Sequence, residues 1–171
     1  MDFGAMLEAG RRDFHEAVRG VTEEHANTRP SPAGWTVLEC VEHVVATEAR
    51  SLQHIAGGRP VTPRRNSRRE SAVATAIRNR LTRVESPEGL RPAGRFRALA
   101  AALAEFDAVR SRSIDFASEQ GERLYSMAAR HPFLGTLNGA EWMYIIDGHA
   151  RRHTEQILEV REAIASLAKT L

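Results

Sequence analysis

The stretch from Trp142 to Leu167 limits most strongly what this 171-residue chain can fold into. Its apolar residues recur every three or four positions, which places them on one face of an α-helix. His149 and His153 fall near the centre of that face, one helical turn apart. The charged residues of the stretch occupy its other faces. The apolar face consists of Trp142, Ile145, Ile146, Ile157, Val160, Ile164 and Leu167.

Two histidines on an apolar face need an explanation, because a buried imidazole requires partners for both ring nitrogens. One interpretation is that His149 and His153 are hydrogen-bonded core residues. The other is a metal site, since side chains at positions i and i+4 of a helix can reach one ion. The central position of both rings on the apolar face favours the metal site.

The same periodicity predicts three further long helices, over about residues 3–24, 37–55 and 95–118. Thr36 and Glu39 form the capping-box pattern of a helix start, and Asn138 is a candidate cap for the last helix. Strand patterns are almost absent. We therefore expect one all-α domain over residues 1–171, a four-helix bundle with a long crossover between helices two and three. That crossover permits up-down-down-up order.

The crossover, residues 59–94, is the least regular part of the chain, with one short helix predicted around residues 70–81. Eight arginines lie between Arg59 and Arg83, but no aromatic residue is interleaved for base stacking and no groove-reading motif is present. The net charge of +2 is also too small to indicate a polyanionic partner. A nucleic-acid partner is therefore disfavoured, and we expect a solvated crossover that partly covers a site.

Cysteine content and hydropathy indicate the compartment. The single Cys40 excludes an internal disulfide and is compatible with a reducing cytoplasm. The first residues carry charges where a signal peptide needs an apolar run, and no segment has the ~20 apolar residues of a membrane helix. We expect a soluble cytoplasmic protein with no membrane partner.

Several other polar residues are candidates for a site. Glu48 lies within the apolar face of the second helix, where it could support a site or form a salt bridge to a neighbouring helix. His43 lies roughly 150° from the centre of that face, so periodicity leaves its role open. Tyr144 and Gln156 could support the site or contact substrate, or be ordinary packing and surface residues, and His131 could support it or cap its loop.

Three stretches carry a resemblance: WTVLECVEH at 35–43, HPFLGTLNGAEW at 131–142 and HARRHTEQI at 149–157. In order and separation they resemble the hallmark stretches of the DinB/YfiT-like superfamily, in its DinB-2-type branch. The resemblance implies a four-helix bundle whose divalent metal is held by His43, His149 and His153. It also implies homodimers. Members of the superfamily include thiol-dependent S-transferases and an isomerase that depends on mycothiol, while many others have no assigned reaction.

A three-histidine site predicts reactivity, because structural zinc sites are normally closed by four protein ligands. A divalent cation lowers the pKa of bound water toward ~7 or deprotonates a coordinating thiol. Imidazole suits zinc, nickel and iron alike. We expect a metal-dependent enzyme that activates a low-molecular-weight thiol for S-transfer to a small-molecule substrate, or water for hydrolysis. The competing hypothesis is a non-catalytic, metal-binding or dimerising bundle, with residues 98–106 either in the core or at the interface.

Overall fold

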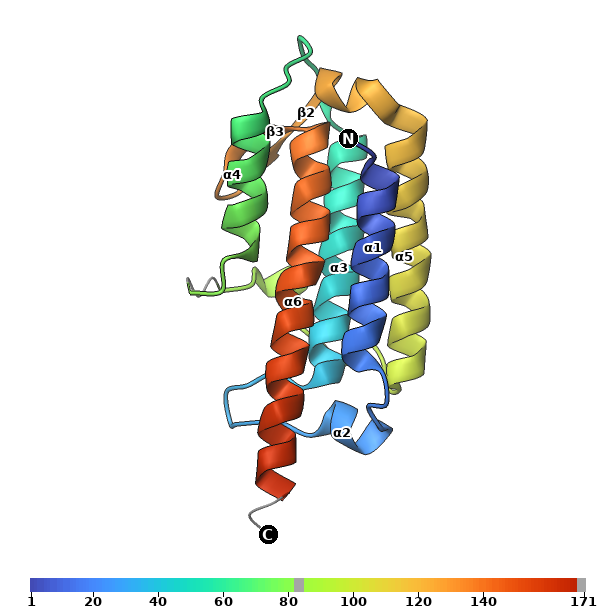
Figure 1. Cartoon of the computed structure of the whole chain (residues 1–171), viewed down its shortest axis with the longest axis vertical. Coiled ribbons are helices and arrows are strands. Elements are labelled where there is room, and N and C mark those ends of the chain that lie inside the picture. Colours follow the sequence, from blue (N-terminus) through green and yellow to red (C-terminus); the bar gives the residue numbers. More distant parts are fainter. Residues whose placement is uncertain (82–84, 169–171) are drawn as a thin grey trace.

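The computed structural model describes residues 1–81 and 85–168, and four long helices make up its body (Figure 1). Each of the first and second long helices packs against both the third and the fourth. The first and fourth run in one direction and the other two run in the opposite direction (Figure 1). The predicted all-α four-helix bundle is confirmed. The four helices are α1 (Phe3–Val18), α3 (Val37–Ala56), α5 (Leu99–Gln120) and α6 (Gly139–Ala168).

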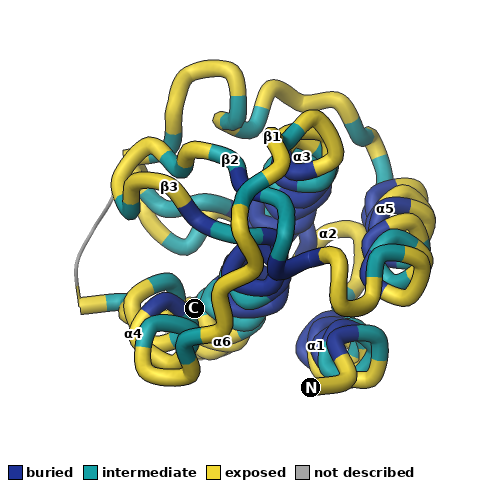
Figure 2. The backbone as a smooth tube through the Cα atoms, turned by 90° about the horizontal axis from the view of Figure 1, so that it is seen from above, coloured by how far each residue is buried: buried dark blue, intermediate teal, exposed yellow. Residues whose placement is uncertain are grey.

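The buried faces of these helices turn toward a common axis (Figure 2). Phe14 of α1 and Phe106 of α5 stack at the centre of one core cluster, with ring centroids 4.3 Å apart. The predicted apolar face of α6 is buried except at Leu167, which is 50% exposed because it lies in the last turn of the helix. In the segment 98–106, Leu99, Ala102 and Phe106 are buried in the bundle and Leu103 is half-buried.

The starts of α3 and α6 follow the predicted caps. The Thr36 side chain accepts a hydrogen bond from the Glu39 backbone N–H, and the Glu39 carboxylate accepts one from Thr36 N–H. Asn138 and Glu141 form the same reciprocal pair before α6, at 2.9 and 2.8 Å. Both boxes satisfy backbone N–H groups that have no partner inside the helix. These short-range pairs make the starts of α3 and α6 predictable from neighbouring residues.

The first predicted helix, 3–24, is wrong at its end. Helix α1 stops at Val18, and Gly20 has φ of 75°, a left-handed conformation that glycine adopts readily. A separate short helix, α2 (Glu23–Asn27), then begins with Thr22 as its cap. Helix α5 also begins later than predicted, at Leu99, whose N–H donates to the Glu23 carboxylate.

A small antiparallel sheet was not predicted. Its strands are β1 (Arg59–Pro60), β2 (Met127–His131) and β3 (Gly135–Asn138), in the order β1-β2-β3. β2 and β3 form a hairpin that closes at the pair His131–Gly135. The strands are too short to show a periodic pattern in the sequence. No helix in the described part of the chain is both long and apolar enough to span a membrane.

The crossover is docked on the bundle although most of its residues are exposed. Its helix α4 (Ser67–Arg78) starts three residues before the predicted one, because the Asn66 side chain caps it. Helix α4 packs against the outside of α6, where a Cβ on Gly148 would lie 2.2 Å from Ile77 Cγ2. A 3₁₀ turn, η1 (Glu88–Leu90), then approaches α3. The crossover therefore covers α6 and reaches α3 at the level of His43.

Candidate metal centre

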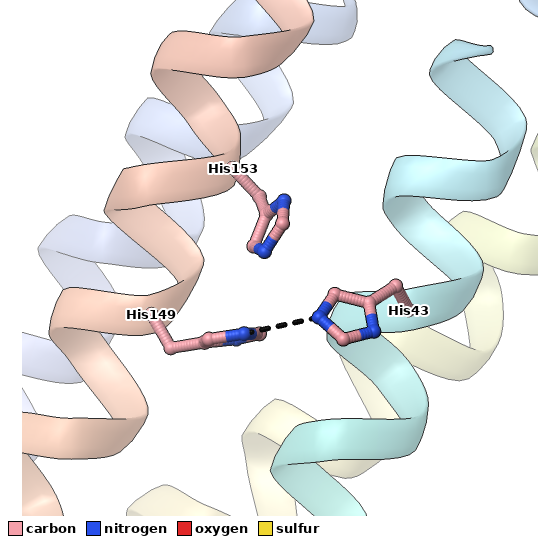
Figure 3. Close-up of side chains that lie close together, drawn as sticks. All are labelled: His43, His149 and His153. Atoms are coloured by element: carbon pink, nitrogen blue, oxygen red, sulfur yellow. Dashed lines mark hydrogen bonds between the residues drawn. The ribbon is translucent and has the colours of Figure 1, made fainter. Parts of the chain in front are cut away.

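Helices α3 and α6 bring His43, His149 and His153 together (Figure 3). One ring nitrogen from each lies within 4.8 Å of the other two. Nε2 of His43 and Nε2 of His149 are 3.2 Å apart. His43, which periodicity left on a side face, points toward α6 because α3 packs against two neighbours, α5 and α6. No second group of three or more such ligands occurs among residues 1–81 and 85–168.

The environment keeps these imidazoles neutral. Burial lowers the pKa of His43, and it lowers the pKa of His149 well below the usual value. Burial, followed by repulsion from His43, lowers the pKa of His153 to about 3. Desolvation disfavours the charged form of a histidine, and each protonated ring would repel the next. Near pH 7 the rings are therefore neutral, the form that binds a metal ion.

The crossover sets the orientation of His43. Its Nδ1–H donates a hydrogen bond to the backbone carbonyl of Leu90, 2.7 Å away. In a neutral ring this places the lone pair on Nε2, which faces His149. A metal-binding histidine typically donates its other N–H to a carbonyl or carboxylate in this way.

Trp35 forms one wall of the cluster. Its ring meets the ring of His43 edge-on at 4.9 Å and stacks on that of His153 at 6.1 Å, with 14° between the planes. His153 Nδ1 is buried and has no well-formed hydrogen bond among the described residues. The Gln156 side chain is near enough to oppose part of the lowering of the His153 pKa.

The cluster fits a divalent ion. Two nitrogens bound about 2.0–2.1 Å from one ion, with a tetrahedral angle between the bonds, lie about 3.3 Å apart. The separation of the two Nε2 atoms, 3.2 Å, agrees with this value. The group contains no carboxylate or thiolate, so three neutral imidazoles would leave at least one coordination position open. Such a set is typical of a reactive site.

The structure places Glu48 away from the histidines. Its carboxylate accepts hydrogen bonds from Arg110 Nε and Nη2, at 2.8 and 2.7 Å, and from Ser113 Oγ at 2.8 Å. Glu48 and Arg110 are 2% and 0% exposed. Of the two roles considered for Glu48, the structure therefore supports the salt bridge to a neighbouring helix, here α5.

His131 and Tyr144 also have local roles. Nδ1 of His131 accepts hydrogen bonds from the N–H groups of Phe133 and Leu134, which caps the hairpin turn. The ring of Tyr144 meets Phe3 of α1 edge-on at 5.6 Å. Cys40 is fully buried, and burial raises the pKa of its thiol to about 12, so it acts as a small apolar residue. Of the four additional candidates, Gln156 lies beside His153, and repulsion from His131 makes a small contribution to the lowered pKa of His149.

Two contributors to the site were missed, Trp35 and Leu90. Trp35 precedes its helix, so helical periodicity says nothing of where its ring lies. Leu90 contributes a backbone carbonyl from an irregular segment, and no side-chain pattern indicates such a contact.

Comparisons with known proteins identify the family and the fold. Residues 6–157 match the model of the DinB superfamily. The uncharacterized protein YuaE of Bacillus subtilis is 23% identical over 163 residues, which span 94% of this chain and 98% of YuaE. Two solved structures share the fold. YfiT from Bacillus subtilis, described as a probable metal-dependent hydrolase with an unusual four-helix bundle topology, superimposes with a TM-score of 0.61 at 15% identity, over 95% of this chain and 86% of YfiT. The four-helix bundle protein TT2238 superimposes with a TM-score of 0.52 at 20% identity, over 93% of this chain and 94% of TT2238.

Proposed function

Because this chain belongs to the DinB superfamily and gathers three neutral histidines, we propose that it is a divalent-metal-dependent enzyme acting on a small molecule. His43, His149 and His153 would hold the ion, which on donor chemistry is zinc, nickel or iron. The observation that carries the proposal is the convergence of three ring nitrogens within 4.8 Å, without a fourth protein ligand in the group. When bound, such an ion lowers the pKa of a coordinated water or thiol and supplies a nucleophile at neutral pH.

The residues around the cluster prepare it for that chemistry. The Leu90 carbonyl holds His43 in the tautomer whose Nε2 lone pair faces the other rings. The Trp35 ring shields His43 and His153 from water on one side. A shielded, low-dielectric site strengthens electrostatic interactions with a reacting group.

Two nucleophiles are compatible with this site. A low-molecular-weight thiol would make the protein an S-transferase, which the sequence resemblance to thiol-dependent members of the superfamily favours. Water would make it a hydrolase, and the description of YfiT as a probable metal-dependent hydrolase supports that alternative. The two reactions differ in whether the thiol is consumed, so one assay separates them.

The first test is metal content, measured by mass spectrometry on protein purified without a histidine tag. We expect about one divalent ion per chain in the wild type and almost none in His149→Ala or His153→Ala. His25→Ala removes an exposed histidine of α2 and is the matched control. Absence of an ion after reconstitution with zinc, nickel and iron would contradict the proposal.

The second test is activity of the loaded protein. Thiol loss in the presence of an alkylating electrophile would identify S-transfer, whereas product release without thiol loss would identify hydrolysis. Either activity should disappear in His149→Ala. A bound ion with no turnover of either kind would favour the non-catalytic bundle. Homodimer formation stays a prediction, which light scattering on the purified protein would test.

A further inference from the structure

A second, separate cleft lies at the end of α3. It has a volume of about 540 Å³ and is formed by the last turns of α3 together with β1 and β2, which lie beside that end of the helix (Figure 2). His54, one of its lining residues, is eleven residues beyond His43 on α3, which corresponds to about 16 Å along the helix axis. The cleft is therefore distinct from the histidine cluster. Its volume is in the range of small-molecule sites.

Three arginines converge on this cleft from three elements, Arg50 of α3, Arg59 of β1 and Arg130 of β2. Arg59 pairs with Ala128, and side chains alternate along a strand, so Arg59 and Arg130 lie on the same face of the sheet. His54 Nε2 lies 2.9 Å from the Arg130 carbonyl, to which its N–H donates. This bond holds β2 against α3 and positions Arg130 at the cleft.

The arginines of the cleft lack the side-chain partners that most other arginines in the described part of the chain have. Within residues 1–81 and 85–168, the side chains of Arg50, Arg59 and Arg130 form no hydrogen bond or ion pair. In contrast, Arg69 pairs with Glu141 at 2.7 Å and Arg80 pairs with Glu159. None of the residues that line the cleft is acidic.

An uncompensated group of positive charges in a concave site attracts anions, since like charges brought together raise the local potential. The C-terminal end of α3 carries a partial negative charge that opposes anion binding, but this effect is weak and is screened by salt. Guanidinium groups donate paired hydrogen bonds that match the oxygen atoms of phosphate groups. The positive charge of the cleft and its hydrogen-bond donors therefore both fit a ligand that carries a phosphate group.

The backbone of the cleft is also adapted to close packing. A Cβ on Gly58 would lie 2.8 Å from the Ile55 carbonyl oxygen and 3.0 Å from that of Ala128. Glycine at this position lets the chain turn from α3 directly into β1 and keeps Arg59 beside β2. We propose that the cleft binds the phosphate or pyrophosphate group of a small-molecule ligand through Arg50, Arg59 and Arg130.

Calorimetric titration with inorganic pyrophosphate tests this proposal. The titration uses the full chain carrying His149→Ala, so that pyrophosphate cannot bind through an ion at the histidines. We expect saturable binding, which the added pair Arg59→Gln and Arg130→Gln weakens at least about tenfold, because two charge-assisted contacts are lost. The control pair, Arg97→Gln and Arg112→Gln, removes the same charge from exposed positions outside the cleft and should change affinity less than about twofold.

Two results would overturn the assignment: no binding at about 5 mM pyrophosphate, or equal weakening by the two pairs of substitutions. Circular dichroism establishes whether the cleft variant remains folded. If the changes in β1 and β2 disturb the sheet, Arg50→Gln on α3 takes their place. Weakening of about threefold or more would then support the site, and unchanged affinity would exclude it. Because every titrated protein carries His149→Ala, this outcome does not depend on whether the three histidines bind an ion.

Discussion

Helix α3 carries two buried polar clusters that differ in how completely their polar groups are paired within the protein. Glu48, Arg110 and Ser113 form a closed cluster: both carboxylate oxygens accept hydrogen bonds, and Arg110 Nη1 donates to the Leu7 carbonyl at 3.0 Å. The three histidines form an open cluster, in which ring nitrogens face one another and no carboxylate takes part. Buried polar groups are costly unless they are paired. A buried polar residue therefore indicates a site only when its partners within the protein are incomplete.

The two clusters also differ in charge. The closed cluster pairs a carboxylate with a guanidinium at 2.7 Å, with almost no exposure of either side chain. The open cluster stays neutral because burial and mutual repulsion lower the histidine pKa values. One cluster therefore joins α3 to α5 through fixed charges, and the other leaves lone pairs available to an ion.

The largest expected effect is on the closed cluster. Glu48→Ala leaves the buried Arg110 guanidinium without its carboxylate, and loss of one partner of a buried ion pair costs about 3–5 kcal/mol of the free energy of unfolding. Urea denaturation measures the loss. Glu105→Ala, in an exposed pair with Arg112, should cost less than about 1 kcal/mol. Comparable losses for the two variants would show that the Glu48 cluster is not closed to water.

Sequence reasoning predicted what depends on neighbouring positions along the chain. Helical periodicity placed His149 and His153 together because both belong to α6, and the Thr36–Glu39 box marked the start of α3. Glu48 was recognised as inward-facing, but its partner Arg110 is 62 residues away on another helix. That pairing depends on how α3 and α5 are rotated against each other, which periodicity does not specify.

His43 shows the same limit for the metal centre. Periodicity put it on a side face of α3, and only the resemblance to a known family assigned it to the site. The packing of α3 against two helices explains why a side face can line the interior. The Leu90 carbonyl and the short sheet depend on backbone contacts between distant segments, which leave no periodic pattern.

The open cluster should respond to metal. A divalent ion at about 100 times its dissociation constant is expected to raise the free energy of unfolding by about 2.7 kcal/mol, since it binds the folded chain alone. Urea denaturation with and without zinc, nickel or iron measures this gain. His153→Ala should abolish it, whereas His25→Ala should retain it in full. An equal gain in the free energy of unfolding of His153→Ala would show that the ion binds elsewhere. The histidine cluster would then not be the open site that distinguishes it from the Glu48 cluster.

The metal-free protein should lose stability in mild acid through the same histidines. The folded pKa of His153 is lowered to about 3, whereas the unfolded value is about 6.5, so between these values the unfolded chain binds a proton that the folded chain does not. The free energy of unfolding therefore falls as pH decreases, with a slope that approaches about 1.4 kcal/mol per pH unit once the unfolded histidine is fully protonated. Because that histidine is only half protonated at pH 6.5, urea denaturation at pH 6.5 and 5.5 should show an extra loss of about 1 kcal/mol in the wild type relative to His153→Leu. Equal losses would mean that the His153 ring is solvated.

The smallest expected effect comes from Ser113→Ala, which tests whether the two clusters are independent of each other. Ser113→Ala removes one hydrogen bond to Glu48 Oε1, but the same oxygen still accepts from Arg110 Nε at 2.8 Å. Because no buried acceptor is left unsatisfied, we expect a loss of only about 1 kcal/mol in the free energy of unfolding. Ser118→Ala, at an exposed position of the same helix, should stay within about 0.5 kcal/mol of the wild type. Metal content should be unchanged in Ser113→Ala, and a loss of the ion would show that the two clusters on α3 are coupled rather than independent.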